Sequence, residues 1–324
     1  MKILCEHAHS ENPALRLNAL WALKHFVIAV SPDLKRSCLE QLEPEWLVQL
    51  IYDDGQEATP YNTQPIQSPG DDVDEEMDAT PSDEQVRWMF AANGNLQKLD
   101  ASRSTKLRQA EDKLANIRES ELNSFKRSRS DEVAVQEQGL ELIRNLVGLG
   151  VGASAESPYD TTEMIDYLFS TIGQDRLFDI LSSKLRAKVL HPFSRRTATP
   201  GQETRLIHPH AKIIIPVIYI LVHIAASTNQ HRQLVVRQTD LLKLLCQQIG
   251  NRDKEVRVAV CHLIINLTGH DEEGEGEAWS MRAAELKKLG FYNRMEYLKH
   301  NDRDLDVRER ARTAVYQLER AIAY

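Results

Sequence analysis

Five segments of this chain repeat one helical pattern, and this recurrence limits the possible folds more than any other feature. Apolar residues recur in the same columns when the segments are aligned, for example Val135, Ile213 and Val256 in one column. Self-similarity of this kind is typical of repeat proteins and has to be recognised before any single element is interpreted. The five segments are Asn12–Ala29, Asp131–Gly148, His210–Ala226, Asp253–Gly269 and Asp304–Ala321.

A polar residue stands at the same place near the end of each segment. These five residues are His25, Asn145, His223, Asn266 and Gln317, and we call them the polar column. A polar position that recurs within otherwise apolar helices indicates a surface built by repetition. We therefore predict that the polar column lines one face of the molecule.

The last hundred residues predict units of three helices, in the order short, medium and long. The polar column gives the period, because 266 − 223 is 43 residues and 317 − 266 is 51 residues. Units of this length and composition are typical of armadillo and HEAT repeats. We find no convincing run of alternating β-branched residues. The sequence thus predicts an all-α, right-handed superhelical armadillo-type solenoid that carries two disordered inserts.

Both inserts fall between the second and third helices of a unit, where a solenoid tolerates insertions. The first insert opens with an acidic stretch, residues 53–84, which has eleven acidic residues and no Lys or Arg. It then becomes mixed in charge, and the second insert is basic. Such compositions cannot bury enough apolar surface to fold. The predicted divisions are a partial first repeat with the start of the next (1–52), the acidic and mixed-charge insert (53–130), armadillo helices (131–190), the basic loop (191–207) and the C-terminal repeats (208–324).

Composition and motifs limit the chemistry that the chain can perform. The net charge is −8, which does not favour nucleic-acid binding, and the four cysteines form no CxxC pair. The longest apolar run, Ile213–Ala226, is too short to span a bilayer, so no membrane association is predicted. We find no nucleotide-binding, hydrolase or zinc-protease motif, and the histidine pairs lack partners at ligand spacing. The sequence predicts a soluble cytoplasmic and nuclear protein without enzymatic activity, cofactor or metal.

The start of the chain fits a second helix followed directly by a third. The first helix of that unit is missing, together with the polar capping repeat that usually covers the end of a solenoid. We therefore expect this sequence to be the C-terminal part of a longer solenoid.

The polar column resembles the peptide-binding arrangement of armadillo repeats. Trp21 and His25 in ALWALKHF resemble the family's Trp-x-x-x-Asn pattern, and Asn145 in LIRNLV and Asn266 in LIINLT match its Asn. The resemblance implies a concave groove in which asparagines hydrogen-bond an extended peptide backbone while Trp21 and Tyr219 anchor its side chains. If so, replacing Asn145 and Asn266 by Ala should weaken binding and leave the melting temperature nearly unchanged.

Three longer stretches resemble the armadillo-repeat scaffold subunit of the GID/CTLH ubiquitin ligase. They are NPALRLNALWALKHF, VAVQEQGLELIRNLV and INLTGHDEEGEGEAWSMRAAELKKLGF. The resemblance implies a non-catalytic scaffold. Its expected partners are a substrate-receptor subunit, held in the groove by the C-terminal repeats, and the core subunits of the ligase. The chain departs from that family in its long acidic insert and its missing N-terminal repeats.

Two other functions remain as alternatives. An importin-α-like carrier or general armadillo adaptor would bind linear peptides, but such carriers repeat the Trp–Asn pair. Here the position of Trp21 is taken in later repeats by Glu141, Tyr219, His262 and Thr313. This irregularity favours a dedicated protein partner, while the missing motifs disfavour an enzyme. A further column, Arg16, Arg257 and Arg308, is expected to bond carboxylates between repeats.

Overall fold

The computed structural model describes residues 1–52, 130–148, 159–190, 205–269 and 276–323. A helix also spans residues 130–147, and we call it the 130–147 helix. The other elements are α1 (Lys2–Ala8), α2 (Pro13–Phe26), the 3-10 helix η1 (Val27–Ala29), α3 (Pro32–Gln41), α4 (Pro44–Tyr52), α7 (Tyr159–Ile172), α8 (Gln174–Leu185), β1 (Lys188–Leu190), β2 (Arg205–Ile207), α9 (Ala211–Ala226), α10 (Asn229–Val236), α11 (Thr239–Gln248), α12 (Lys254–Leu267), α13 (Gly276–Lys288), α14 (Phe291–Asn301) and α15 (Leu305–Ala323).

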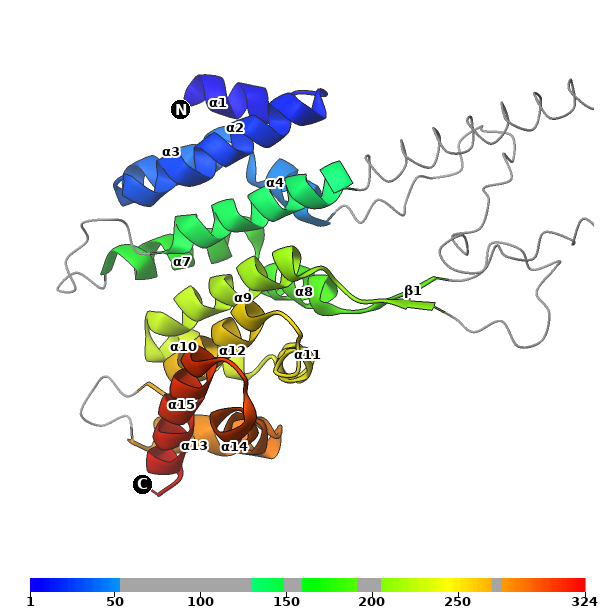
Figure 1. Cartoon of the computed structure of the whole chain (residues 1–324). Coiled ribbons are helices and arrows are strands. Elements are labelled where there is room, and N and C mark those ends of the chain that lie inside the picture. Colours follow the sequence, from blue (N-terminus) through cyan, green and yellow to red (C-terminus); the bar gives the residue numbers. More distant parts are fainter. Residues whose placement is uncertain (53–129, 149–158, 191–204, 270–275, 324) are drawn as a thin grey trace, which may run out of the picture. The chain divides into compact units, whose positions relative to one another are not determined.

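These helices group into units of three, as the sequence predicts. After the leading pair α1–α2, the units are α3–α4–(130–147), α7–α8–α9, α10–α11–α12 and α13–α14–α15. The third helices pack on one another, most extensively α9 with α12 and α12 with α15. Figure 1 shows the units following one another, from α1 and α2 at one end to α13, α14 and α15 at the other. The described part of the chain is therefore an armadillo-type helical repeat fold.

The third helices start where the sequence predicts because polar side chains cap them. The Asn12 side chain accepts hydrogen bonds from two backbone amides at the start of α2, and Pro13 occupies its first position. Asp253 caps α12, and Asp304 accepts from the Asp306 amide in α15. His210 does the same for α9 through its Nδ1 atom. Such caps satisfy amides that have no partner within the helix.

The apolar columns of the third helices form the core. In the first column Val135, Ile213, Val256 and Val307 are buried, whereas Leu15 is 39% exposed. Leu15 lies on α2, in the leading pair α1–α2. Full burial of an aliphatic side chain contributes roughly 1.5–3 kcal/mol, so the columns hold successive repeats together.

Buried cations cover the carboxyl ends of three third helices. Lys35 of α3 donates to the carbonyls of Asn145, Leu146 and Gly148 at the end of the 130–147 helix, at 2.7–3.3 Å. Two arginines act in the same way at the next two ends. Arg232 of α10 bonds the Ala225 carbonyl of α9, and Arg282 of α13 bonds the Leu267 carbonyl of α12, each at 3.0 Å. These bonds satisfy carbonyls that the helix leaves without a partner.

The described fold is all-α as predicted, with one short pair of strands that the sequence did not reveal. The segments β1 and β2 pair in a two-stranded sheet beside the second insert. Each strand is three residues long, which is too short for alternation to be recognised in the sequence. Most of the predicted basic loop, and nearly all of the first insert, lie outside the described residues, so their predicted disorder stays a prediction.

By contacts, the chain divides into two units. The first holds residues 1–56, 132–188 and 206–324, and it contains all the helices of the repeats. The second holds residues 57–131 and 189–205, which lie mostly outside the described residues.

Candidate functional site: the polar column and its neighbours

The structure places the polar column on five successive third helices, but its members are not equally available. Trp21 and His25 on α2 are exposed, whereas Asn145, His223, Asn266 and Gln317 are partly covered. The contacts of these side chains divide the face of the third helices into two regions. The first region, around Trp21 and His25, is exposed and aromatic. In the second region, the side chains make contacts between neighbouring repeats.

The two asparagines of the column bind neighbouring repeats. Asn145 donates from Nδ2 to the Lys24 carbonyl of α2 at 2.9 Å, and Asn266 donates to the Val222 carbonyl of α9 at 3.0 Å. In both cases the acceptor directly precedes the polar-column residue of the previous repeat. An amide also carries a second N–H and an acceptor oxygen. These asparagines therefore keep bonding capacity, but each is also an inter-repeat tie.

Two further members of the column, His223 and Gln317, are partly buried. For His223, burial changes the charge state of the side chain. It is the main reason that the pKa of His223 falls to about 4, and the nearby Arg144 and Lys35 lower it further. This imidazole is therefore neutral near pH 7. The side-chain oxygen Oε1 of Gln317 lies 3.0 Å from the Thr268 hydroxyl oxygen at the end of α12. Gln317 thus also makes a contact between neighbouring repeats.

An open aromatic pair stands at the α2 end of the face. The Trp21 side chain is 56% exposed, and its ring meets the His25 ring edge-on with centroids 4.6 Å apart. An indole so exposed offers a large apolar area and an N–H donor to a partner. Trp21 and His25 are therefore the members of the predicted site that are most available to a ligand.

A chain of polar contacts crosses the rest of the face. Arg144 of the 130–147 helix pairs with Glu141 at 2.9 Å and lies 4.4 Å above the ring of Tyr219 on α9. The Tyr219 ring is edge-on to His262 of α12, with centroids 6.2 Å apart, and His262 contacts Arg310 of α15. Tyr219 was predicted as a second aromatic anchor. The structure places it half-buried beneath a guanidinium, where burial raises its pKa.

The arginine column behaves as expected at one of its members. Arg257 forms a two-pronged pair with Asp302 of the next repeat, at 2.6 and 3.0 Å, and both side chains are buried. It also donates to the Asn251 and Arg252 carbonyls. Arg16 instead bonds the Ser10 carbonyl of its own repeat at 3.0 Å. The expectation of carboxylate partners is therefore wrong for Arg16, because the turn before α2 presents a carbonyl there.

One serine, one histidine and one aspartate also lie in line. The buried His231 lies 2.6 Å from Ser227 Oγ through Nδ1 and 3.0 Å from Asp166 Oδ1 through Nε2. The Ser227 hydroxyl is 2.9 Å from the Ile224 carbonyl at the end of α9, which it bonds. The His231–Asp166 contact makes the trio a tie between α7 and the α9–α10 corner. Among the described residues, no group of three or more His, Cys, Asp or Glu side chains could hold a metal ion.

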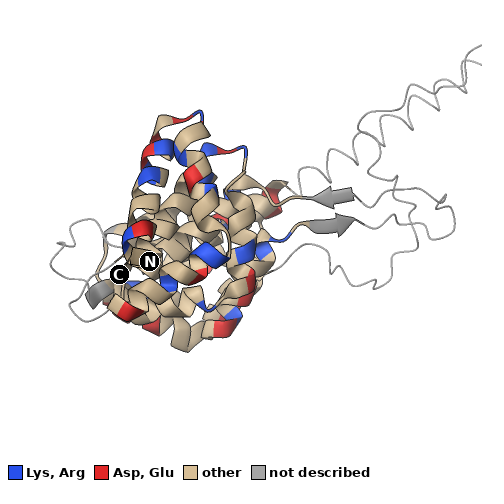
Figure 2. Cartoon of the chain, turned by 90° about the horizontal axis from the view of Figure 1, so that it is seen from below, with Lys and Arg blue, Asp and Glu red and all other residues tan. Residues whose placement is uncertain are grey.

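Figure 2 shows Lys and Arg positions interspersed with Asp and Glu positions along the described helices. Several of these charges pair between neighbouring repeats, for example Arg36 with Glu163 at 2.8 Å and Arg176 with Glu45 at 2.7 Å. Within the described residues, no helix is both long enough and apolar enough to cross a membrane.

Sequence reasoning located the repeats but missed the residues that join them. Lys35, Arg144, Arg232 and Arg282 were not singled out, although each makes contacts with a neighbouring helix that hold the stack together. The feature in the sequence that could have identified them is a charged residue within the apolar stripe of a helix. Its partner lies on another helix and cannot be read from local spacing.

Among solved structures, the chain is similar to two designed armadillo repeat proteins. A computationally designed armadillo repeat protein for modular peptide recognition matches with a TM-score of 0.43 and 15% identity over 98% of each chain. A designed armadillo repeat protein in complex with a (KR)4 peptide matches with a TM-score of 0.42 and 14% identity, again over 98% of each chain. No protein-family profile matches the sequence.

One curated relative makes the likeness more specific. GID complex subunit 5 of Schizosaccharomyces pombe is 31% identical to the chain over 115 residues, which cover 36% of this chain and 10% of that protein. The match spans about a tenth of the curated relative's length. The comparison supports the resemblance to the armadillo scaffold subunit of a GID complex.

Proposed function

We propose that this chain is a non-catalytic armadillo scaffold of a GID/CTLH-type ubiquitin ligase. In this proposal its third-helix face is the groove that holds the substrate-receptor subunit, so that bound substrates are ubiquitinated and degraded. The observation that supports it most is the sequence match to GID complex subunit 5. The helical repeats agree with it, because stacked repeats provide long binding surfaces.

The contacts on the face suggest where the receptor binds. Trp21 and His25 are exposed, whereas Asn145, Tyr219 and Asn266 already serve contacts between repeats. Aromatic side chains that lose their exposure on binding are frequent hot spots of protein interfaces. We therefore place the main receptor contact on the Trp21–His25 pair, and we give His223 and Gln317 a supporting role along the same face.

The remaining assignments follow from the scaffold role. The chain needs neither a cofactor nor a metal to act as a scaffold, and it takes no part in the chemistry of ubiquitin transfer. Its partners are the receptor and core subunits of the ligase, rather than nucleic acid or a membrane. The cytoplasm and the nucleus are its places of action.

The test is affinity capture of the tagged chain from native cell extract, with quantitative mass spectrometry of the recovered proteins. The Trp21→Ala/His25→Ala variant is compared with the wild-type chain and with Tyr316→Ala as control. Tyr316 is a comparably exposed aromatic residue, 57% exposed, on α15. Circular dichroism establishes that all three proteins are folded.

The expected result is recovery of ligase subunits by the wild type and the control, with selective loss of one subunit from the Trp21/His25 variant. Equal recovery by all three proteins would remove Trp21 and His25 from the site and leave the scaffold assignment standing. Absence of ligase subunits from every capture contradicts the scaffold itself. Recovery of transport receptors or many unrelated proteins with basic peptides would favour the importin-α-like carrier.

A further inference from the structure

A guanidinium and an imidazole meet where α12 packs on α15, on the face of the third helices. The Nη1 atom of Arg310 on α15 contacts the Nε2 atom of His262 on α12. A guanidinium carries only N–H donors, so the imidazole nitrogen has to accept this hydrogen bond. The contact therefore requires a neutral His262 whose proton is on Nδ1.

The same guanidinium also holds a carboxylate. Arg310 donates from Nε to Oδ1 of Asp306, one turn earlier on α15, at 2.9 Å. The side chains of Arg310 and Asp306 are 36% and 56% exposed, so water reaches both groups. Arg310 can thus keep its pair with Asp306 when the contact with His262 is lost, and its guanidinium can turn towards solvent.

The surroundings of His262 favour the neutral imidazole. Burial lowers its pKa most, the charge of Arg310 lowers it further, and Asp306 raises it, with a net pKa below the ordinary value. From α9, the Tyr219 ring faces His262 with centroids 6.2 Å apart, and this phenol is uncharged at neutral pH because burial raises its pKa. The helices α10 and α11 also pack on α12, but among the described residues Arg310 and Asp306 are the charged groups that act on His262.

From the contact and its place between two repeats, we propose that His262 and Arg310 form an acid-sensitive contact, which joins α12 to α15 while His262 is neutral and releases the Arg310 guanidinium when His262 is protonated. Once Nε2 carries a proton it can no longer accept, and two positive charges face each other. Arg310 then leaves His262 and remains with Asp306. The face of the third helices thereby gains a positive charge and an accessible guanidinium on α15. The proposal does not rest on the receptor site, whose main contact is the Trp21–His25 pair on α2.

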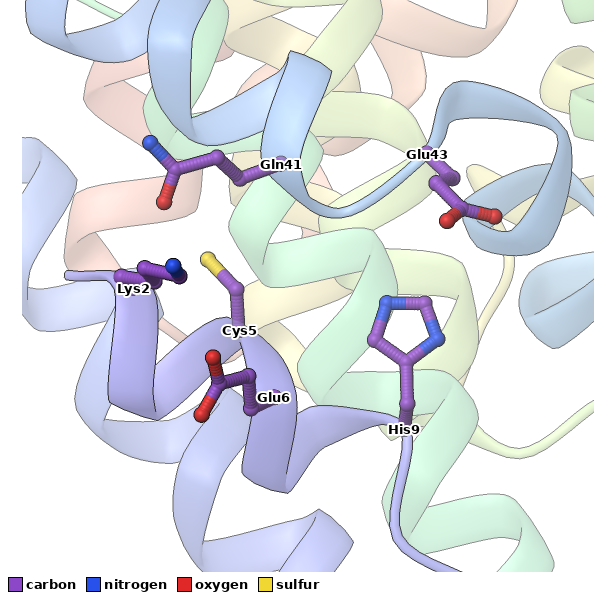
Figure 3. A pocket seen from close by; sticks show the side chains of 6 residues that line it. All are labelled: Lys2, Cys5, Glu6, His9, Gln41 and Glu43. Atoms are coloured by element: carbon purple, nitrogen blue, oxygen red, sulfur yellow. The ribbon is translucent and has the colours of Figure 1, made fainter.

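His9 provides an internal comparison at the α1 end of the stack. Like His262 it is partly buried and lies beside an aromatic ring, with 4.1 Å between the centroids of His9 and Trp46. Figure 3 shows the His9 ring at a pocket of about 390 Å³, whose lining residues are Lys2, Cys5, Glu6, His9, Gln41 and Glu43. No arginine is among these described lining residues, so within the pocket His9 meets no guanidinium.

The test is nitrogen NMR of the full chain with isotope-labelled histidine and arginine, titrated from about pH 8 to about pH 5. At the higher pH we expect His262 with its proton on Nδ1, as read from the chemical shifts of its two ring nitrogens. On acidification both ring nitrogens should become protonated, and the side-chain signals of Arg310 should shift with the same midpoint. His223, whose pKa is about 4, stays largely neutral over this range and does not obscure the transition.

Two variants assign the transition to the contact. In His262→Gln the side-chain oxygen can still accept from Arg310 but does not titrate, so the Arg310 signals should stay constant across the pH range. His9→Gln is the matched control, in which Arg310 should titrate as in the wild type. Circular dichroism at both ends of the pH range establishes that each protein is folded.

Two observations on the wild-type chain would overturn the proposal. One is a His262 whose proton is on Nε2 at about pH 8, because Nε2 could then not accept from Arg310. The other is a set of Arg310 signals that does not change while His262 titrates. Both are made on the unsubstituted chain, so a variant that fails to fold leaves the test intact.

Discussion

The buried pair of Arg257 and Asp302 joins the last two repeats, and its removal makes the sharpest test of how the stack is held together. We consider Arg257→Met, which keeps an unbranched apolar chain of similar length and removes the charge. The substitution abolishes two contacts with Asp302 and two with the carbonyls of Asn251 and Arg252, at 2.6–3.0 Å.

The expected cost follows from the burial of the partner that remains. The side chains of Arg257 and Asp302 are 7% and 5% exposed, so the substitution leaves a carboxylate with little access to water. Removing one member of a buried pair usually costs about 3–5 kcal/mol. We expect about 3 kcal/mol, at the lower end, because Asp302 keeps a hydrogen bond from the Asp304 amide at 2.9 Å.

The pH dependence gives a second measure of the same pair. Burial raises the pKa of Asp302, but the hydrogen bonds from Arg257 and the Asp304 amide outweigh it, so the net pKa lies below the ordinary value. A lowered carboxyl pKa stabilises the folded state above the pKa of the unfolded chain, near 4. That stabilisation should disappear as the pH falls below 4, and it should be absent from the Arg257→Met variant.

The assay is urea unfolding followed by circular dichroism, together with native-state hydrogen exchange of the α15 amides. The control is Arg312→Met. Arg312 pairs with Glu309 on the surface, with side chains 59% and 51% exposed, so its loss should cost less than about 1 kcal/mol. The double variant Arg257→Met/Asp302→Asn should lose at least about 1 kcal/mol less than the sum of the single losses. If Arg257→Met destabilises no more than Arg312→Met, the reasoning from burial is refuted.

Three further predictions follow from contacts described above. Asn266→Ala should cost about 1 kcal/mol of stability because the Val222 carbonyl loses a donor, and an unchanged urea midpoint would contradict the inter-repeat bond. Glu43→Gly should raise the free energy of unfolding by roughly 0.5–1 kcal/mol and so raise the urea midpoint, because Glu43 has a φ of 56° before Pro44 and Gly adopts this region without strain. An unchanged midpoint would show that the backbone is not strained. The free energy of unfolding should fall by up to roughly 3 kcal/mol as the pH falls from 6.5 to about 4, because His223 takes up a proton in the unfolded chain but stays neutral in the folded chain. The His223→Gln variant should show a smaller fall in urea titrations across that pH range.

The last repeat unit shows what sequence alone can reveal about this fold. Apolar periodicity and capping residues such as Asp253 and Asp304 act within one helix, so the helix and its start could be predicted locally. Gly290, which follows α13, has a left-handed backbone with φ 90°, a conformation that glycine adopts readily. Helix ends are less exact, because assignments there differ by one or two residues.

Contacts between repeats could not be predicted in the same way. The polar column identified Asn145 and Asn266 as special, but their hydrogen-bond acceptors lie on the preceding third helix and depend on how two helices pack. Those bonds change the expectation that both asparagines could be replaced without loss of stability. The exposure of Trp21 and the partial burial of Tyr219 likewise result from helix packing. The predicted site stays a prediction that the affinity capture tests.

The covered carboxyl ends of the third helices have an electrostatic consequence. Each helix end carries the equivalent of about half a negative charge, and here Lys35, Arg232 and Arg282 meet three such ends. Their partners are buried carbonyls, whereas pairs such as Arg36–Glu163 lie in solvent, where salt screens them. Cohesion along this edge should therefore persist at high ionic strength, and added salt should weaken mainly the surface pairs.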